Sequence, residues 1–160
     1  MKKLIFYVLL IVLVLDAAVL QCQQLTIQIE SAKPIVLTRA DVEALPRVEV
    51  KAGGPDTPVT FAGVSLELLL QKAGVSLGES LRGKRLASCL LVGAADGYRV
   101  VIALPEIDPA FSDKQFVLAF SRNGKPLDEK EGPYRIVIPD EKRMARWVRQ
   151  VTALKIVDVE

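Results

Sequence analysis

The chain has 160 residues, with 21 lysines and arginines against 19 aspartates and glutamates, for a formal net charge of +2. A charge this close to zero argues against a nucleic-acid partner, because such proteins carry a strongly basic surface. The chain contains no histidine, which removes both the commonest metal ligand and the commonest general base.

The N-terminal residues 1–22 have the pattern of an export signal. Lys2 and Lys3 precede an unbroken apolar run over residues 4–15. This run is shorter than the roughly 20 residues that a bilayer span needs, but it matches the apolar core of a signal peptide. No clean cleavage site follows, so signal-peptidase cleavage, retention as a membrane anchor and lipidation at Cys22 all stay open. We expect an exported, periplasmic or other extracytoplasmic protein.

Residues 23–160 are predicted to form one domain, because their number suits a single hydrophobic core. Apolar alternation and turn residues predict strands over residues 25–29, 35–37, 48–52, 58–61, 86–95, 98–104, 116–120, 134–138 and 152–159. The near-continuous apolar run over 86–95 predicts a central strand buried on both faces. Helical spacing and capping residues predict short helices over 41–45, 66–73, 105–108 and 144–148.

Several of these elements have explicit start and stop signals. Thr38 and Asp41 match a helix N-cap with its capping box, and Ser65 is a second N-cap candidate. Gly74 stands where a helix C-terminus favours glycine, and Asn123-Gly124 predicts a tight hairpin turn. Many short strands interrupted by short helices predict an α+β domain with a mixed sheet.

Three short stretches carry residues with chemical potential. Asp96-Gly97-Tyr98-Arg99 reads first as a hairpin turn, because Asp-Gly fits such turns for geometric reasons. Arg135 enters an apolar strand after Gly132-Pro133, so we expect it to be buried and bonded to backbone oxygens or to a carboxylate.

The third stretch, residues 140–149, places four cations beside the only tryptophan, Trp147. Arg143, Arg146 and Arg149 are three residues apart and would share one face of a helix. Such a face is either simply solvated or, because like charges repel, a binding site for an anion.

The chain resembles the sulfite-oxidase-type molybdopterin-binding domain. The segments "FAGVSLELLLQKAGV", "DGYRVVIALPEI" and "NGKPLDEKEGPYRIVIPDEKRMARWVRQVTALKIV" occur in the order seen in that family. The closest likeness is to its small, exported, stand-alone relatives. The resemblance implies the family's mixed α+β fold and, as in its larger members, a pocket for an anionic pterin cofactor.

The resemblance also assigns cofactor-binding residues. Family members place a tyrosine near the active site, at a position similar to Tyr98. They place an arginine and a lysine before a tryptophan in an "A-R-x-x-K-W" pattern, which Arg143 and Arg146 match with arginine in place of lysine. The resemblance therefore implies that Tyr98, Arg143 and Arg146 line a pocket for an anion.

The chain departs from the family at the metal. The family's molybdenum is held by a cysteine thiolate on the strand before the "GVSLELLL" helix, whereas residues 48–52 here read "VEVKA". Lys51 cannot replace a soft thiolate ligand. Cys89 lies on a different, apolar strand, where we expect a packing thiol. We therefore predict no catalytic and no metal-ligating residue.

The leading interpretation is an exported binding or accessory module without catalytic molybdenum, whose ligand is a small anion or a pterin. No cofactor is expected from the residues, whereas the family resemblance implies molybdopterin. The alternative is a molybdopterin-dependent oxidoreductase subunit of an envelope redox system, with the metal ligand supplied from elsewhere. A third interpretation is a structural partner of a membrane redox complex. The missing cysteine argues most strongly against the second interpretation.

Overall fold

The computed structural model describes residues 24–30, 32–53, 58–139 and 141–158. The predicted export signal, residues 1–22, lies outside them. Within the described part of the chain, no helix combines the length and the apolar character that a membrane crossing requires.

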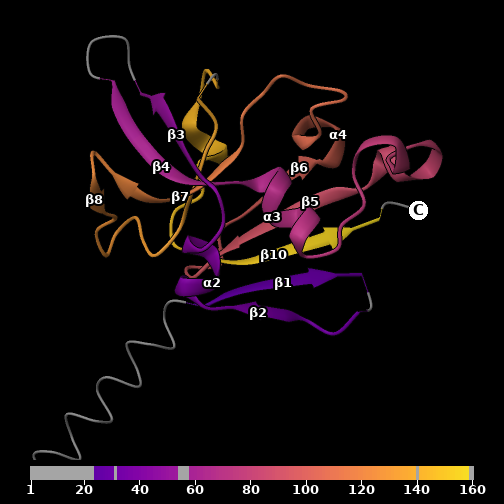
Figure 1. Ribbon diagram of the computed structural model, residues 1–160, viewed down its shortest axis with the longest axis horizontal. Helices are drawn as coiled ribbons and strands as arrows, with labels where there is room; N and C mark the ends of the chain where they lie inside the picture. Colours follow the sequence, from indigo (N-terminus) through magenta and orange to yellow (C-terminus); the bar gives the residue numbers. More distant parts are fainter. Residues whose placement is uncertain (1–23, 31, 54–57, 140, 159–160) are drawn as a thin grey trace, which may run out of the picture.

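Two β-sheets form the body of the molecule (Figure 1). In the described residues, the first sheet has five strands in the order β2-β1-β10-β5-β6. β1 and β10 run parallel and the other neighbours run antiparallel, so this sheet is mixed, as predicted. Its strands are β1 (Leu25–Ile29), β2 (Ile35–Leu37), β5 (Cys89–Ala94), β6 (Arg99–Ala103) and β10 (Val151–Val157).

The second sheet is antiparallel throughout its described pairings and has the order β3-β4-β7-β8, with β9 also paired to β7. The sequence predicted β3, β4, β7 and β9, but it predicted neither the short strand β8 nor that these strands form a sheet of their own. These strands are β3 (Arg47–Ala52), β4 (Val59–Ser65), β7 (Val117–Arg122), β8 (Lys125–Pro126) and β9 (Arg135–Val137).

The helices are short and lie between strands. They are α2 (Arg39–Glu43), α3 (Leu66–Lys72), α4 (Leu104–Ile107) and the 3-10 helices η1 (Gly78–Ser80), η2 (Gly83–Ala87) and η3 (Met144–Arg146). The predicted capping box of α2 is confirmed. The Asp41 amide donates to the Thr38 hydroxyl, and the Thr38 amide donates to the Asp41 carboxylate at 2.8 Å. The helix begins at Arg39, two residues earlier than predicted, since Thr38 itself is the cap.

The prediction for residues 86–95 was partly wrong. Residues 83–87 form η2, and β5 begins only at Cys89. β5 is not buried on both faces: Leu90 and Val92 are fully buried, while Cys89 and Leu91 are half-buried on the opposite face. The reason is that β5 belongs to an antiparallel arrangement in which only one face meets the core.

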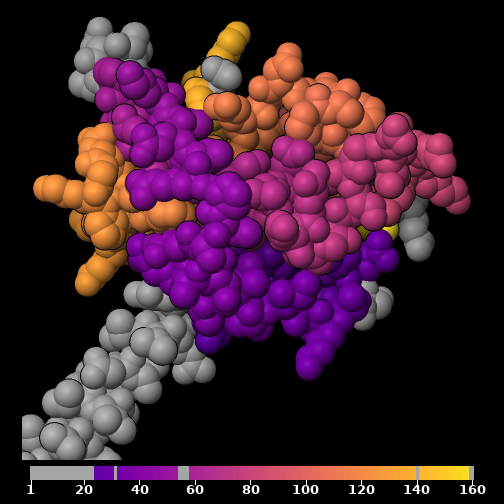
Figure 2. Space-filling view, in the orientation of Figure 1, coloured from indigo at the N-terminus to yellow at the C-terminus, as the bar shows by residue number. Residues whose placement is uncertain are grey.

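One continuous hydrophobic core connects the two sheets. It takes fully buried residues from the first sheet, such as Ile102 and Leu154, and from the second, such as Leu118 and Ile136. Each such side chain contributes about 1.5–3 kcal/mol of burial free energy. In Figure 2 the purple N-terminal part of the chain lies directly against both the orange and the magenta parts.

The segment before β10 joins the two sheets through backbone hydrogen bonds. The amide of Ile136 in β9 donates to the oxygen of Val148 at 2.8 Å, and the amide of Val151 donates to the oxygen of Tyr134 at 2.9 Å. On the other side, the amide of Ala95 in the β5–β6 turn donates to the oxygen of Gln150 at 3.0 Å. The fold therefore holds the arginine-rich segment between the second sheet and the β5–β6 turn.

Candidate functional site

A hollow of about 380 Å³ opens where the β5–β6 turn meets the segment before β10. This volume is in the range of small-molecule sites. The charged and aromatic residues among those that line it are Asp96, Tyr98, Lys130, Trp147 and Arg149. Two cations against one carboxylate give the lining a net positive charge, which favours an anionic occupant.

Tyr98 connects the two walls of this hollow. Its hydroxyl donates a hydrogen bond to the backbone oxygen of Ala145 at 2.9 Å, and its amide donates to the Asp96 carboxylate at 2.9 Å. Gly97 adopts a φ of 86°, which a residue without a side chain accepts readily. Asp96-Gly97 therefore forms the predicted turn, and Tyr98, with 49% of its surface exposed, faces the hollow.

Arg146 is held by two carboxylates. Its NH1 and NH2 groups donate to the two oxygens of Glu106 at 3.1 and 3.2 Å, and its Nε donates to Glu141 at 2.8 Å. Hydrogen bonds to Glu141 first and Glu106 second raise the pKa of Arg146 above its usual range. The same contact with Arg146 lowers the pKa of Glu106. The guanidinium thus ties η3 to α4.

Arg143 is exposed and is the residue that precedes η3. It forms no ion pair with any other residue that the structure describes. The predicted helical face shared by three arginines was wrong. The helix is only Met144–Arg146, so Arg143 and Arg149 lie outside it on either side.

The three residues that the resemblance assigned to a cofactor do not all line one hollow, although Tyr98 contacts Ala145, which lies between Arg143 and Arg146 in the sequence. Tyr98 lines it, while Arg143 and Arg146 flank the lining residues Met144 and Ala145 without lining it themselves. Their role in binding stays a prediction.

The sequence did not indicate Lys130 as a lining residue, and it predicted that Arg149 shares a helical face, although the helix ends at Arg146. The two cations are brought together by contacts that span about twenty positions of the chain. The side-chain amide of Gln150 donates to the oxygen of Glu129 at 2.7 Å, and the Gln150 amide donates to the oxygen of Glu131. A local pattern carries no signal of such a pairing.

Arg135 lies beneath this region and is 5% exposed. Its guanidinium carbon lies 5.4 Å from the ring centroid of Phe61 and 5.5 Å from that of Trp147, and it forms an ion pair with Glu131. Such cation–π contacts stabilise a desolvated arginine. The prediction of a buried arginine bonded to a carboxylate is confirmed. Glu131 also forms an ion pair with Arg122, whose side chain is exposed, at a nitrogen–oxygen distance of 3.3 Å.

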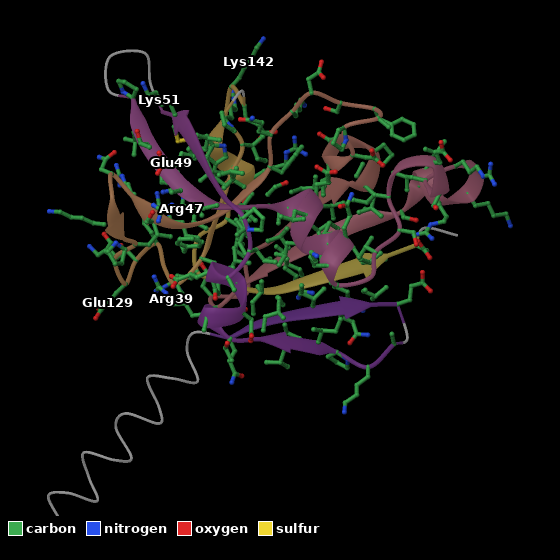
Figure 3. The ribbon with its side chains drawn as sticks, viewed as in Figure 1. Arg39, Arg47, Glu49, Lys51, Glu129 and Lys142 are labelled. Atoms are coloured by element: carbon green, nitrogen blue, oxygen red, sulfur yellow. The ribbon has the colours of Figure 1, made fainter. Side chains whose placement is uncertain are left out.

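β3 offers no ligand that fits a thiolate-bound metal. Arg47, Glu49 and Lys51 occupy its exposed face (Figure 3). Among the described residues, no group of three histidines, cysteines or carboxylates lies close enough together to hold a metal ion. The free thiol of Cys89 belongs to β5 in the other sheet. The donors at this position therefore do not fit the family's metal.

A second hollow, of about 390 Å³, lies beside β3. Its charged lining residues are Glu49, Glu67, Asp113 and Lys114. Three carboxylates against one cation make this hollow negative, so it repels the phosphate of a pterin cofactor. Of the two hollows, the one beside Tyr98 has the charge that suits an anion.

Comparison with known proteins points to one family. The chain resembles the crystal structure of the sulfane dehydrogenase SoxCD from Paracoccus pantotrophus, with a TM-score of 0.66 and 25% sequence identity. The alignment covers 86% of this chain but only 39% of that one, so this chain spans well under half of the protein it matches. A comparison with curated proteins found none that matches.

The family comparison covers the part of the chain that lines the hollow beside Tyr98. The model of the oxidoreductase molybdopterin binding domain matches residues 56–160, which include β4 to β10 and all of the residues that line the hollow beside Tyr98. The match extends over more than half of the sequence and agrees with the structural likeness. The chain belongs to the oxidoreductase molybdopterin binding domain family.

Proposed function

We propose that this protein is an exported binding or accessory module of the molybdopterin-binding fold, which binds a small anion beside Tyr98 and carries no catalytic molybdenum. The observation that carries the proposal is the contrast between two positions. The hollow beside Tyr98 has the cations Lys130 and Arg149 in its lining, whereas β3 has a lysine and no thiol where the family binds its metal.

The lining residues suit an oxyanion such as a phosphate. Arg149 offers a forked set of donors and Lys130 a mobile ammonium group, and both side chains are exposed enough to close on a ligand. In this proposal Arg146 positions the wall, because its own donors are bonded to Glu106 and Glu141. Arg143, which is exposed and unpaired among the described residues, supplies a further cation at the rim.

The absence of molybdenum chemistry is inferred from donor type. Molybdenum in this family is bound by a soft thiolate, and an ammonium group cannot serve as a ligand at all. Cys89, the free thiol of the described residues, is half-buried on β5 of the other sheet and not on β3. The pterin itself remains an acceptable anion for the positive hollow.

A second candidate function is that of a molybdopterin-dependent oxidoreductase subunit, favoured by the family match over residues 56–160. It requires that a partner supplies the metal ligand. A membrane or envelope redox protein would be such a partner, and the export signal predicted for residues 1–22 would bring the two into one compartment.

Binding of inorganic pyrophosphate to the full chain, measured by isothermal titration calorimetry, tests the anion site. We expect saturable binding that weakens with added salt. Replacing both Arg149 and Lys130 by glutamine should weaken it by about a hundred-fold or more, since each charge-assisted hydrogen bond is worth about 1.5–3 kcal/mol.

The matched control replaces Lys84, an exposed cation of η2 that does not line the hollow, by glutamine. This variant should bind as the unchanged protein does. Absence of saturable binding, or equal losses in the control and in the Arg149 and Lys130 variant, would overturn the anion site.

A further inference from the structure

The two faces of the first sheet differ in burial. On its inner face, residues such as Leu90, Ile102 and Leu154 are fully buried in the core. The opposite face, which we call the outer face, contains no buried residue. Strand pairing assigns to the outer face the residues Thr26, Gln28, Val36, Cys89, Leu91, Gly93, Arg99, Val101, Ala103, Ala153, Lys155 and Val157.

The middle of the outer face is apolar, with Val101 exposed and the residues around it half-buried. Leu91 lies opposite Val101 on β6, and Cys89 lies opposite Ala103 and Val157. Val101 is 55% exposed. Beside them, Gly93 and Ala153 pair across β5 and β10. Gly93 has no side chain and Ala153 only a methyl group, so they allow the backbone of a partner to approach closely. An exposed apolar sheet face of this kind marks an interaction surface.

The charges on the outer face have one sign. Arg99 lies at the β6 edge and Lys155 lies on the central strand β10, opposite Leu91. The outer face contains no aspartate or glutamate among the described strand residues. A complementary surface must therefore supply carboxylates around an apolar centre.

We propose that the outer face docks a protein partner whose contact surface is apolar at its centre and carries carboxylates opposite Arg99 and Lys155. This inference is independent of the anion site, since none of the outer-face residues lines the hollow beside Tyr98. It concerns an interaction surface and leaves the proposed ligand unchanged.

Two other occupants fit the outer face less well. A second copy of the same chain would bring Arg99 and Lys155 of both copies into one interface without a carboxylate to pair them. A lipid surface is matched by clusters of cations and by large apolar or aromatic side chains that insert. The most exposed apolar side chains of the outer face are only the valines Val36 and Val101.

The test is photo-crosslinking in the native host with the full chain. A photo-reactive amino acid replaces Val101 on the outer face or, as the control, Lys51 on the exposed face of β3 in the other sheet. We expect a crosslink from the Val101 position to one protein, with the crosslinked peptide apolar and rich in aspartate or glutamate, and no such product from the Lys51 position.

Charge reversal makes the test specific. Replacing Arg99 and Lys155 by glutamate in the same chain should lower the crosslinking yield about ten-fold, and changing the partner's facing carboxylates to lysine should restore it. Both residues are exposed, so the two substitutions should leave the fold intact. The melting temperature of the variant checks this. Adding the purified partner should also make the alkylation of Cys89 several-fold slower than in the protein alone. The mass of the peptide that contains Cys89 measures the extent of alkylation.

The proposal is overturned if the Val101 position gives no crosslink, or crosslinks only to lipid or to a second copy of the chain. It is also overturned if both positions give the same product, if the crosslinked peptide lacks carboxylates, or if charge reversal leaves the yield unchanged in a folded variant.

Discussion

The hydroxyl of Tyr98 donates a hydrogen bond to the backbone oxygen of Ala145 at 2.9 Å, across 47 positions of the chain. Through this bond the β5–β6 turn is attached to η3, the helix that Arg143 precedes and Arg146 ends. The aromatic ring thus forms one wall of the positive hollow and also fixes the distance to the opposite wall.

Replacing Tyr98 by phenylalanine removes this bond and keeps the ring. Because both groups are partly exposed and water can replace the partner, we expect a loss of only about 0.5–1 kcal/mol in the free energy of unfolding. Urea denaturation of the two proteins measures the difference. An unchanged free energy would mean that the hydroxyl does not hold η3 in place.

Replacing Arg135 by alanine should cost about 3 kcal/mol, because Glu131 would lose its buried partner and the space between Phe61 and Trp147 would lose its packing. The control is Arg122→Ala, which removes an exposed partner of the same Glu131 and should cost at most about 1 kcal/mol. Thermal unfolding ranks the two variants. Equal melting temperatures for Arg135→Ala and the unchanged protein would contradict the structural role of Arg135.

Gly63 marks the closest approach between β4 and β7. A methyl group on it would lie 2.1 Å from the backbone oxygen of Leu118 and 2.5 Å from the Cα of Ala119, and both are backbone atoms that cannot rotate away. Gly63→Ala should therefore destabilise the fold by about 3 kcal/mol.

Gly93→Ala is the matched control for Gly63, since the added methyl group would make an ordinary contact of 3.7 Å with the Ala153 side chain. Its free energy of unfolding should stay within about 1 kcal/mol of the unchanged protein. A ranking in which Gly93→Ala is the more damaging change would contradict a close backbone approach of β4 and β7 at Gly63.

The contact between Glu106 and Arg146 should make stability depend on pH. Hydrogen bonding to Arg146 lowers the pKa of Glu106 below its usual value of 4.5. A depressed carboxyl pKa contributes stability that is complete above pH 4.5 and is lost as the pH falls through the lower, folded-state pKa.

The variant Glu106→Gln isolates this contribution. Its melting temperature should lie below that of the unchanged protein at pH 7, and the gap should close at acidic pH, where Glu106 becomes neutral. A gap that is constant, or that widens as the pH falls, has the wrong sign for a carboxylate stabilised by Arg146.

Local features of the fold could be predicted from the sequence because their causes lie within a few residues. The Thr38–Asp41 capping box is one such feature. The Asn123-Gly124 turn is another, and both of its residues adopt positive φ values, 49° and 75°. The α+β class followed from the same kind of signal, and the family resemblance followed from three short segments in order.

Long-range features could not be predicted in the same way. Nothing near Arg146 in the sequence indicates that its guanidinium would bond to Glu106, which lies forty positions earlier. The apolar run that contains β5 reads alike for a strand buried on one face and for one buried on both, since Leu91 and Val92 are equally hydrophobic. Tertiary placement decides both cases, and it also decides that Lys130 and Arg149 line the same hollow.

The central claim is that this member of the molybdopterin-binding family acts without molybdenum. The most direct measurement is the molybdenum content per chain, by inductively coupled plasma mass spectrometry, of full-length protein purified from its native host. The account predicts far less than one molybdenum atom per chain, because β3 supplies a lysine and no thiolate. One molybdenum atom per chain would contradict it and would favour the oxidoreductase subunit instead.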